Sequence, residues 1–256
     1  MNPAAKSISI SIVSHGQLAL VTELLDDIQK HCSESSLEVV LTLNIPEDLP
    51  DSLNNLSFPL KVIYNSQPLG FGENHNRAFR HTIGGFFCVI NPDIRINSNV
   101  FPALVQSLND HSVGVVAPLV VDANGVIEDS ARRFPTPLKI ICKAMGRCKG
   151  RDYFIDNSSI YPEWIGGMFM VLPRYVFEGI NGFNQKYFLY YEDVDLCARV
   201  WLRGLRVALN PQVKATHVAR RSSHGDARYL LIHIRSMMRF FLSITFFKVI
   251  YLRKNR

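Results

Sequence analysis

Residues 8–28 read ISISIVSHGQLALVTELLDDI. Isoleucines alternate with serines from Ile8 to Ile12, which is the period-two pattern of a strand, and from Leu18 onward the apolar residues recur at helical spacing. A strand, a turn and a helix are therefore expected. The next apolar run, LEVVLTL at 37–43, is typical of a parallel strand that is covered on both faces.

The same alternation continues through the first hundred residues. Strands are expected at 60–64 and 86–90, and the glycine-containing segment 67–73 opens a helix between them. This order predicts an α/β fold with a Rossmann-like, doubly wound, mostly parallel sheet flanked by helices. Such a sheet binds ligands at the carboxyl ends of its strands.

Regular structure is expected to continue after a weakly periodic segment. Residues 132–161 are rich in Pro, Lys, Arg and Cys, and we interpret them as a mobile excursion over the active face. Order returns at Trp164. The predicted organisation is one domain, residues 1–225, followed by a basic amphipathic helix, residues 226–256.

The positive charge of the chain is concentrated at its C-terminal end. The net charge is +6, but residues 214–256 hold ten Lys or Arg and one Asp, which gives +9 there and leaves −3 on the rest. An acidic body without a basic stripe argues against a nucleic-acid partner. The longest uncharged stretch of the tail, 240–247, is far shorter than the roughly 20 residues that span a membrane. We expect the tail either to lie on an anionic membrane surface or to pack its first half on the body.

Cysteine usage and the N-terminal sequence indicate the compartment. The five cysteines form no C-x-x-C pair, which favours unpaired thiols in a reducing compartment. The first residues, MNPAAKSISISIV, lack the pattern of a signal peptide. A cytoplasmic location is expected.

Carboxylates occur at two places where chemistry is plausible. Asp93 follows the strand 86–90 and could bind a divalent cation, although Asn91-Pro92-Asp93 alone is better explained as a turn. Glu192 and Asp193 follow the aromatic segment FLYY, where burial would raise a carboxyl pKa enough for general-base catalysis. On spacing alone, they cap a helix, and Asp195 could pair with Arg199.

Two further features have a functional and a structural interpretation. His217 follows a short strand and could complete a cation site or hold a phosphate, although a lone histidine is more often structural. The segment 70–74 could present backbone N–H groups to a phosphate, but it matches neither a dinucleotide fingerprint nor a Walker loop. The turn Ser14-His15-Gly16 also lacks that fingerprint, which excludes a Rossmann oxidoreductase.

Together these segments resemble family 2 of the glycosyltransferases, and they are most similar to its bacterial rhamnosyltransferase-like members. The resemblance covers residues 8–240. It rests on the strings NSQPLGFGENHN (65–76), FFCVINPDIRI (86–96), WIGGMFMVLPR (164–174), GINGFNQKYFLYYEDVDLCARVWLRG (179–204) and the histidine of VKATHV (213–218).

The resemblance implies a GT-A fold and sugar transfer with inversion from a dTDP- or UDP-sugar, with rhamnose as the suggested sugar. It also implies a Mg or Mn ion and a glycan or lipid-linked acceptor in cell-surface polysaccharide synthesis. It makes Asp193 the catalytic base and places Glu192 beside it. The residues implied at the acceptor and sugar are Trp164, Gly166, Gly167 and Glu192; those at the metal are Asp93 and His217; those at the donor nucleotide are Ser14, Asn44, Asn65, Gly70, Asn74, Asn91 and Asp93.

One departure concerns the nucleotide base. The family usually has a base-reading Asp at the end of the second strand, where this chain has Thr42-Leu43-Asn44. Either Asn44 substitutes for it or the base is held differently. A degenerate transferase that binds a sugar nucleotide without turnover is therefore the alternative to an active enzyme, ahead of a nucleic-acid-binding protein.

Overall fold

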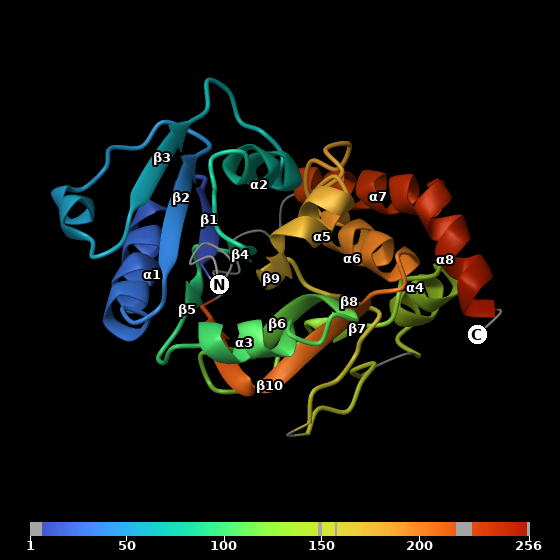
Figure 1. Cartoon of the computed structure of the whole chain (residues 1–256). Helices are drawn as coiled ribbons and strands as arrows, with labels where there is room; N and C mark the ends of the chain where they lie inside the picture. The colour runs from blue at the N-terminus through green and yellow to red at the C-terminus, as the bar shows by residue number, and fades with distance from the viewer. Residues whose placement is uncertain (1–6, 148–149, 157, 219–226, 255–256) are drawn as a thin grey trace.

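One eight-stranded sheet organises the chain (Figure 1). The computed structural model describes residues 7–147, 150–156, 158–218 and 227–254. The strand order is β3-β2-β1-β4-β9-β6-β10-β5. The strands are β1 (Ile8–Ser14), β2 (Leu37–Leu43), β3 (Leu60–Tyr64), β4 (Phe86–Ile90), β5 (Ile94–Arg95), β6 (Val113–Asp122), β9 (Phe169–Pro173) and β10 (Arg206–His217), and a separate pair is β7 (Ala131–Arg132) with β8 (Trp164–Ile165).

The sheet is mostly parallel, as predicted. β1 pairs in parallel with β2 and β4, and β6 pairs in parallel with β10. Two strands are exceptions. β9 lies antiparallel between β4 and β6 and joins the two parallel halves, and the short edge strand β5 pairs antiparallel with β10.

Helices cover both faces of the sheet, so the expected doubly covered arrangement is confirmed. One core cluster includes side chains of α1 and α3, and the other includes side chains of α5, α6, α7 and α8. The helices are α1 (Leu18–His31), α2 (Phe71–Phe79), α3 (Phe101–Ser107), α4 (Pro137–Ala144), α5 (Arg174–Gly179), α6 (Glu192–Leu202), α7 (Ala227–Phe241) and α8 (Ile244–Lys254), with a 3-10 turn at Asp51–Asn55.

The segment 132–161 contains regular structure that its composition did not reveal. Thr136 caps α4, because its hydroxyl accepts a hydrogen bond from the Lys139 N–H at 3.2 Å, and Pro137 follows at the first helical position. Where an excursion without regular structure was expected, a capped helix lies beside the C-terminal helices (Figure 1).

The C-terminal segment forms two helices instead of the predicted one. Ser243 begins α8, since its hydroxyl accepts a hydrogen bond from the Phe246 N–H at 3.1 Å. Phe240 and Val249 are fully buried in the second core cluster, so the tail packs on the body. Among the described residues no single helix is long and apolar enough to span a membrane; α7 and α8 together meet the length and composition but are bent by 59°.

His75 in α2 is buried against the first strand. Its Nδ1 lies 2.8 Å from the Ser11 hydroxyl, and the Phe71 ring lies 4.5 Å away. Burial disfavours the imidazolium and lowers the pKa of His75 from 6.5 to about 3. Because the unfolded chain takes up this proton first, stability is lost as pH falls from 6.5 toward 3.

We predict that His75→Gln weakens this pH dependence. Between pH 7 and pH 5 the wild type should lose about 2 kcal/mol of unfolding free energy through this one group, and the variant should not. Urea titrations at both pH values measure the difference, with His111→Gln, an exposed histidine, as the control. Equal losses in the wild type and His75→Gln would contradict the prediction.

Candidate active site

Three titratable side chains meet where β4 and β10 end. His217 pairs with Ile94 in the β10–β5 ladder, which brings its Nε2 to 3.2 Å from an Asp93 carboxylate oxygen. Its Nδ1 lies 3.0 Å from Glu128. The hydrogen bond to Asp93 is the largest of the effects that raise the pKa of His217 to about 9, with the charges of both carboxylates adding to it.

This cluster has the chemistry of a small cation site. Asp93 Oδ1 is buried and has no hydrogen-bond partner among the described residues, while Oδ2 faces the imidazole. The carboxylate of Glu128 orients the second imidazole nitrogen, an arrangement that is common around metal-binding histidines. Among the described residues no group of three or more His, Cys, Asp or Glu side chains is placed to hold a metal ion by itself. Asp93 and His217 thus fit a cation whose remaining ligands are diphosphate oxygens and water.

The predicted nucleotide-side asparagines form one hydrogen-bonded network. Asn44 Oδ1 accepts hydrogen bonds from Asn65 Nδ2 and from the Leu69 N–H, both at 2.8 Å, and its Nδ2 donates to the Leu69 carbonyl oxygen at 3.0 Å. Asn65 Nδ2 also donates to Asn74 Oδ1 at 2.6 Å. The network holds the loop before α2, and the Asn44 side chain is committed to that loop. Gly70 is required there, because a Cβ would lie 2.8 Å from the Phe188 carbonyl oxygen.

Ser14 is engaged by a carboxylate that sequence reasoning missed. Its hydroxyl donates to Glu47 at 2.5 Å, and Glu47 also accepts the N–H groups of Gly16 at 3.0 Å and Leu18 at 2.9 Å. Glu47 therefore caps the N-terminus of α1 from the loop after β2.

Glu192 and Asp193 begin α6 directly after two residues in the left-handed region, Tyr190 (φ 68°) and Tyr191 (φ 67°). Left-handed backbone is uncommon for bulky residues, and here it turns the chain sharply into the helix. Asp193 stays partly accessible and accepts hydrogen bonds from the Gly167 N–H at 3.0 Å and its neighbour Val194 at 2.7 Å.

Both carboxyl groups hold protons more tightly than usual. Burial raises the pKa of Glu192 well above its ordinary value, and the charge of Asp193 raises it further. Burial also raises the pKa of Asp193, against the lowering effect of the bonds from Gly167 and Val194 and of the Arg132 charge. Since Glu192 Oε2 has no partner among the described residues, we expect Glu192 to carry the proton at neutral pH.

The loop from Trp164 to Met168 connects these parts. The Met168 carbonyl accepts the Asn91 N–H at 2.9 Å, Gly167 binds Asp193, and Gly166 N–H donates to the Ser130 carbonyl at 2.8 Å. A Cβ at Gly167 would lie 3.3 Å from the Asp193 Cβ, so glycine permits the close approach. Trp164 pairs with Arg132 across the β7–β8 ladder.

Of the predicted residues, three line a common cavity of about 360 Å³: Trp164, Glu192 and Asp193. Its wall also includes Arg132, Arg133 and residues of α4 and α7. The lining of this cavity does not include Gly166, Gly167, Asp93 or His217.

Comparison with known proteins identifies the family. The model described as glycosyl transferase family 2 matches residues 9–163, more than half of the chain. The chain belongs to glycosyl transferase family 2. A second model, the N-terminal domain of galactosyltransferase, matches residues 153–223.

Relatives of this glycosyltransferase include rhamnosyltransferases. Rhamnosyltransferase WbbL of Escherichia coli K12 is 27% identical over 250 residues, which cover 90% of this chain and 91% of that protein. N-acetylglucosaminyl-diphospho-decaprenol L-rhamnosyltransferase of Mycobacterium tuberculosis is 26% identical over 179 residues, 64% of this chain and 57% of that protein.

Solved structures confirm the GT-A fold. GalNAc-T7 with UDP, GalNAc and Mn2+ superposes with a TM-score of 0.67 at 15% identity, covering 91% of this chain and 47% of the other. The mannosyltransferase PcManGT of Pyrobaculum calidifontis, in complex with GDP-Man and Mn2+, superposes with a TM-score of 0.60 at 18% identity. The match covers 91% of this chain and 64% of the other.

Sequence reasoning missed Glu128 in this glycosyltransferase, although a signal for it exists. Residues 122–125 read Asp-Ala-Asn-Gly, which favours a turn, and this turn folds the chain back, so that the Glu128 N–H donates to the Val120 carbonyl at 2.9 Å. That return places Glu128 beside the end of β10, where His217 lies.

The three acids at the start of α6 should respond differently to neutralisation. Asp195 is buried and pairs with Arg199 at 2.7 Å, which confirms the predicted i,i+4 pair, and Arg199 also donates to the carbonyl groups of Ile180 and Gly182. We predict that Asp195→Asn lowers the unfolding free energy by about 2–4 kcal/mol, because it leaves a half-buried guanidinium without its charge partner.

Glu192→Gln should change stability by less than about 1 kcal/mol, since a protonated carboxyl is already neutral. Urea unfolding at pH 7 compares the two variants. A loss in Glu192→Gln as large as that in Asp195→Asn would show that Glu192 is ionised in the folded protein.

Proposed function

We propose that this chain is a metal-dependent, inverting glycosyltransferase. It transfers a sugar from a dTDP- or UDP-sugar to a hydroxyl of a glycan or lipid-linked acceptor in cell-surface polysaccharide synthesis. The observation that carries the proposal is the Asp193 carboxylate, which lines the cavity while the Gly167 N–H holds it in place. The names of two relatives favour rhamnose as the sugar.

On the donor side, Asp93 and His217 would hold a Mg or Mn ion, with Asn91 at the same strand end. Such an ion would offset the negative charge that grows on the leaving diphosphate. The Mn2+ bound in the two similar solved structures supports a divalent cation in general. Ser14, Asn44, Asn65, Gly70 and Asn74 would form the nucleotide side, where the Asn44 network shapes the loop and leaves base contacts to the surrounding groups.

On the acceptor side, Asp193 would remove the proton of the attacking hydroxyl. Its raised pKa makes it a stronger base than a solvated carboxylate. Trp164, Gly166, Gly167 and Glu192 would shape the acceptor and sugar site. A base that removes the acceptor proton while the oxygen attacks the anomeric carbon corresponds to direct displacement, and therefore to inversion.

We place the enzyme in the cytoplasm, peripheral on the inner face of the cell membrane. Residues 226–256 would act as the membrane-facing part attached to the 1–225 transferase domain. Exposed apolar side chains on α7 and α8, such as Leu231 and Phe247, together with Arg and Lys residues in the same helices, support this placement.

Asp193→Asn should lower kcat by about 10²–10⁴-fold, because the base is lost while the donor site is intact. Sugar transfer is measured by release of the nucleoside diphosphate, and donor binding by calorimetry. Asp26→Asn, an exposed acid on α1, is the control. Turnover that survives in Asp193→Asn would refute the assignment of the base, and loss of donor binding would point to a structural role.

A thermal-shift screen should identify the donor and the ion together. A ligand that binds only the folded state raises the melting temperature. We expect dTDP- or UDP-sugars to do so in the presence of Mn2+ and much less in EDTA or in Asp93→Asn. A shift that is independent of the ion would instead assign charge neutralisation to the His217 imidazolium, and no shift with any nucleotide would favour a binding-deficient relative of the family.

A further inference from the structure

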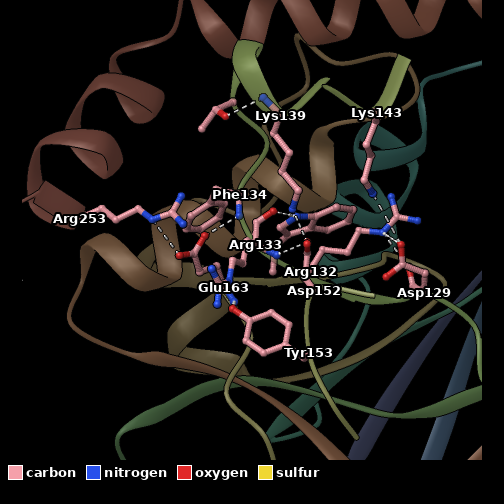
Figure 2. Close-up of polar contacts among 12 residues, drawn as sticks. Asp129, Arg132, Arg133, Phe134, Lys139, Lys143, Asp152, Tyr153, Glu163 and Arg253 are labelled. Atoms are coloured by element: carbon pink, nitrogen blue, oxygen red, sulfur yellow. Dashed lines mark hydrogen bonds and ion pairs between the residues drawn. The ribbon is translucent and has the colours of Figure 1, made fainter. Parts of the chain in front are cut away.

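Part of the cavity wall is strongly basic. It contains Arg132 at the end of β7, Arg133 directly after it, and Lys139 and Lys143 of α4 (Figure 2). Neither the donor site nor the base requires these residues. Four cations gathered in one cavity need a reason, because like charges at this separation repel one another.

Their partners offset only part of the charge. Arg132 pairs with Asp129 at 3.0 Å, and Lys143 reaches the same carboxylate oxygen at 3.9 Å. Lys139 pairs with Asp152. Among the described residues no carboxylate lies within ion-pair distance of Arg133, whose guanidinium lies over the Tyr153 ring at 5.9 Å (Figure 2). Two carboxylates thus pair with three of the four cations, and even with Asp193 of the same cavity counted the wall keeps a positive surplus.

The helices that border the cavity expose apolar side chains. On α4, Leu138 is 71% exposed and Ile141 is 55% exposed. On α7, which contributes His233 to the cavity wall, Leu230 is 61% exposed. A ligand that suits this neighbourhood is anionic at the cavity and apolar beyond it.

We propose that the cationic wall formed by Arg132, Arg133, Lys139 and Lys143 binds the diphosphate of a lipid diphosphate acceptor, whose hydrocarbon chain passes over the exposed apolar side chains of α4. This assignment rests on the proposed transferase function and names the acceptor class of the same site. A diphosphate on this wall would place the attached sugar toward Asp193, which lines the same cavity. The donor diphosphate is proposed above to bind at Asp93 and His217, which do not line this cavity.

The site can be tested on the full chain without any transfer reaction. Calorimetry measures the binding of farnesyl diphosphate, farnesol and inorganic pyrophosphate to the wild type, Arg133→Gln and Lys143→Gln. These two side chains have the loosest partners, so their replacement should not disturb folding, and melting temperatures check this. Lys61→Gln on the edge strand β3 is the matched control.

We expect farnesyl diphosphate to bind the wild type and each cavity variant to bind it 5–10-fold more weakly, since each charge-assisted contact is worth roughly a factor of ten. Lys61→Gln should bind as the wild type does. Farnesol should bind much more weakly, and pyrophosphate should bind with a lower affinity that is sensitive to the same variants.

The proposal would be overturned if farnesyl diphosphate did not bind, or if the two cavity variants bound it as tightly as Lys61→Gln does. It would also be overturned if the cavity variants weakened only the binding of the sugar nucleotide, which would assign the wall to the donor. Sugar transfer with an unaffected lipid affinity would refute this site and leave the proposed function intact. Lipid binding that is weakened in the cavity variants, without any binding of a sugar nucleotide, would support this site and contradict the proposed transferase function.

Discussion

The hydrogen bond from the Gly167 N–H to Asp193 ties the active face together. It joins α6 to the loop that enters β9, the antiparallel strand between the two parallel halves of the sheet. The same loop accepts the Asn91 N–H at Met168 and places Trp164 in the cavity. A side chain at 167 would press on Asp193, so the contact depends on glycine. Moving this loop would displace the turn at Asn91, the Asp193 carboxylate and the cavity wall at Trp164 together.

Three acids within one turn of α6 show how environment assigns roles to the same chemical group. Asp195 is neutralised by Arg199 and anchors the turn around Gly182, so it is structural. Glu192 is buried without a partner for one oxygen, which favours its neutral form. Asp193 has backbone N–H donors and an open edge, which keep an ionised oxygen available to a substrate. Helix capping, the simpler explanation from spacing, fits none of the three fully.

Much of the architecture was predictable from periodicity, because buried parallel strands and amphipathic helices leave local patterns. The direction of β9 was not, since it depends on how the Trp164–Met168 loop packs on α6. Glu128 and Glu47 were also missed, because each acts through contacts that are distant in the sequence. Glu128 contacts His217, 89 positions away, and Glu47 contacts Gly16, 31 positions away. The break between α7 and α8 was not predicted, because Ser243 can be recognised as a helix cap only when its hydrogen bond to the Phe246 N–H is known.

Under the proposed function, the charge pattern around Asp193 would allow one base to serve two anionic substrates. A donor diphosphate and an acceptor diphosphate would repel each other, and both would repel the Asp193 carboxylate. A cation held by Asp93 and His217 would screen the donor diphosphate, and the wall of Arg132, Arg133, Lys139 and Lys143 would screen the acceptor diphosphate. The raised pKa of Asp193 then matters, because a carboxylate near so many cations would otherwise become too weak a base to accept the proton of a sugar hydroxyl.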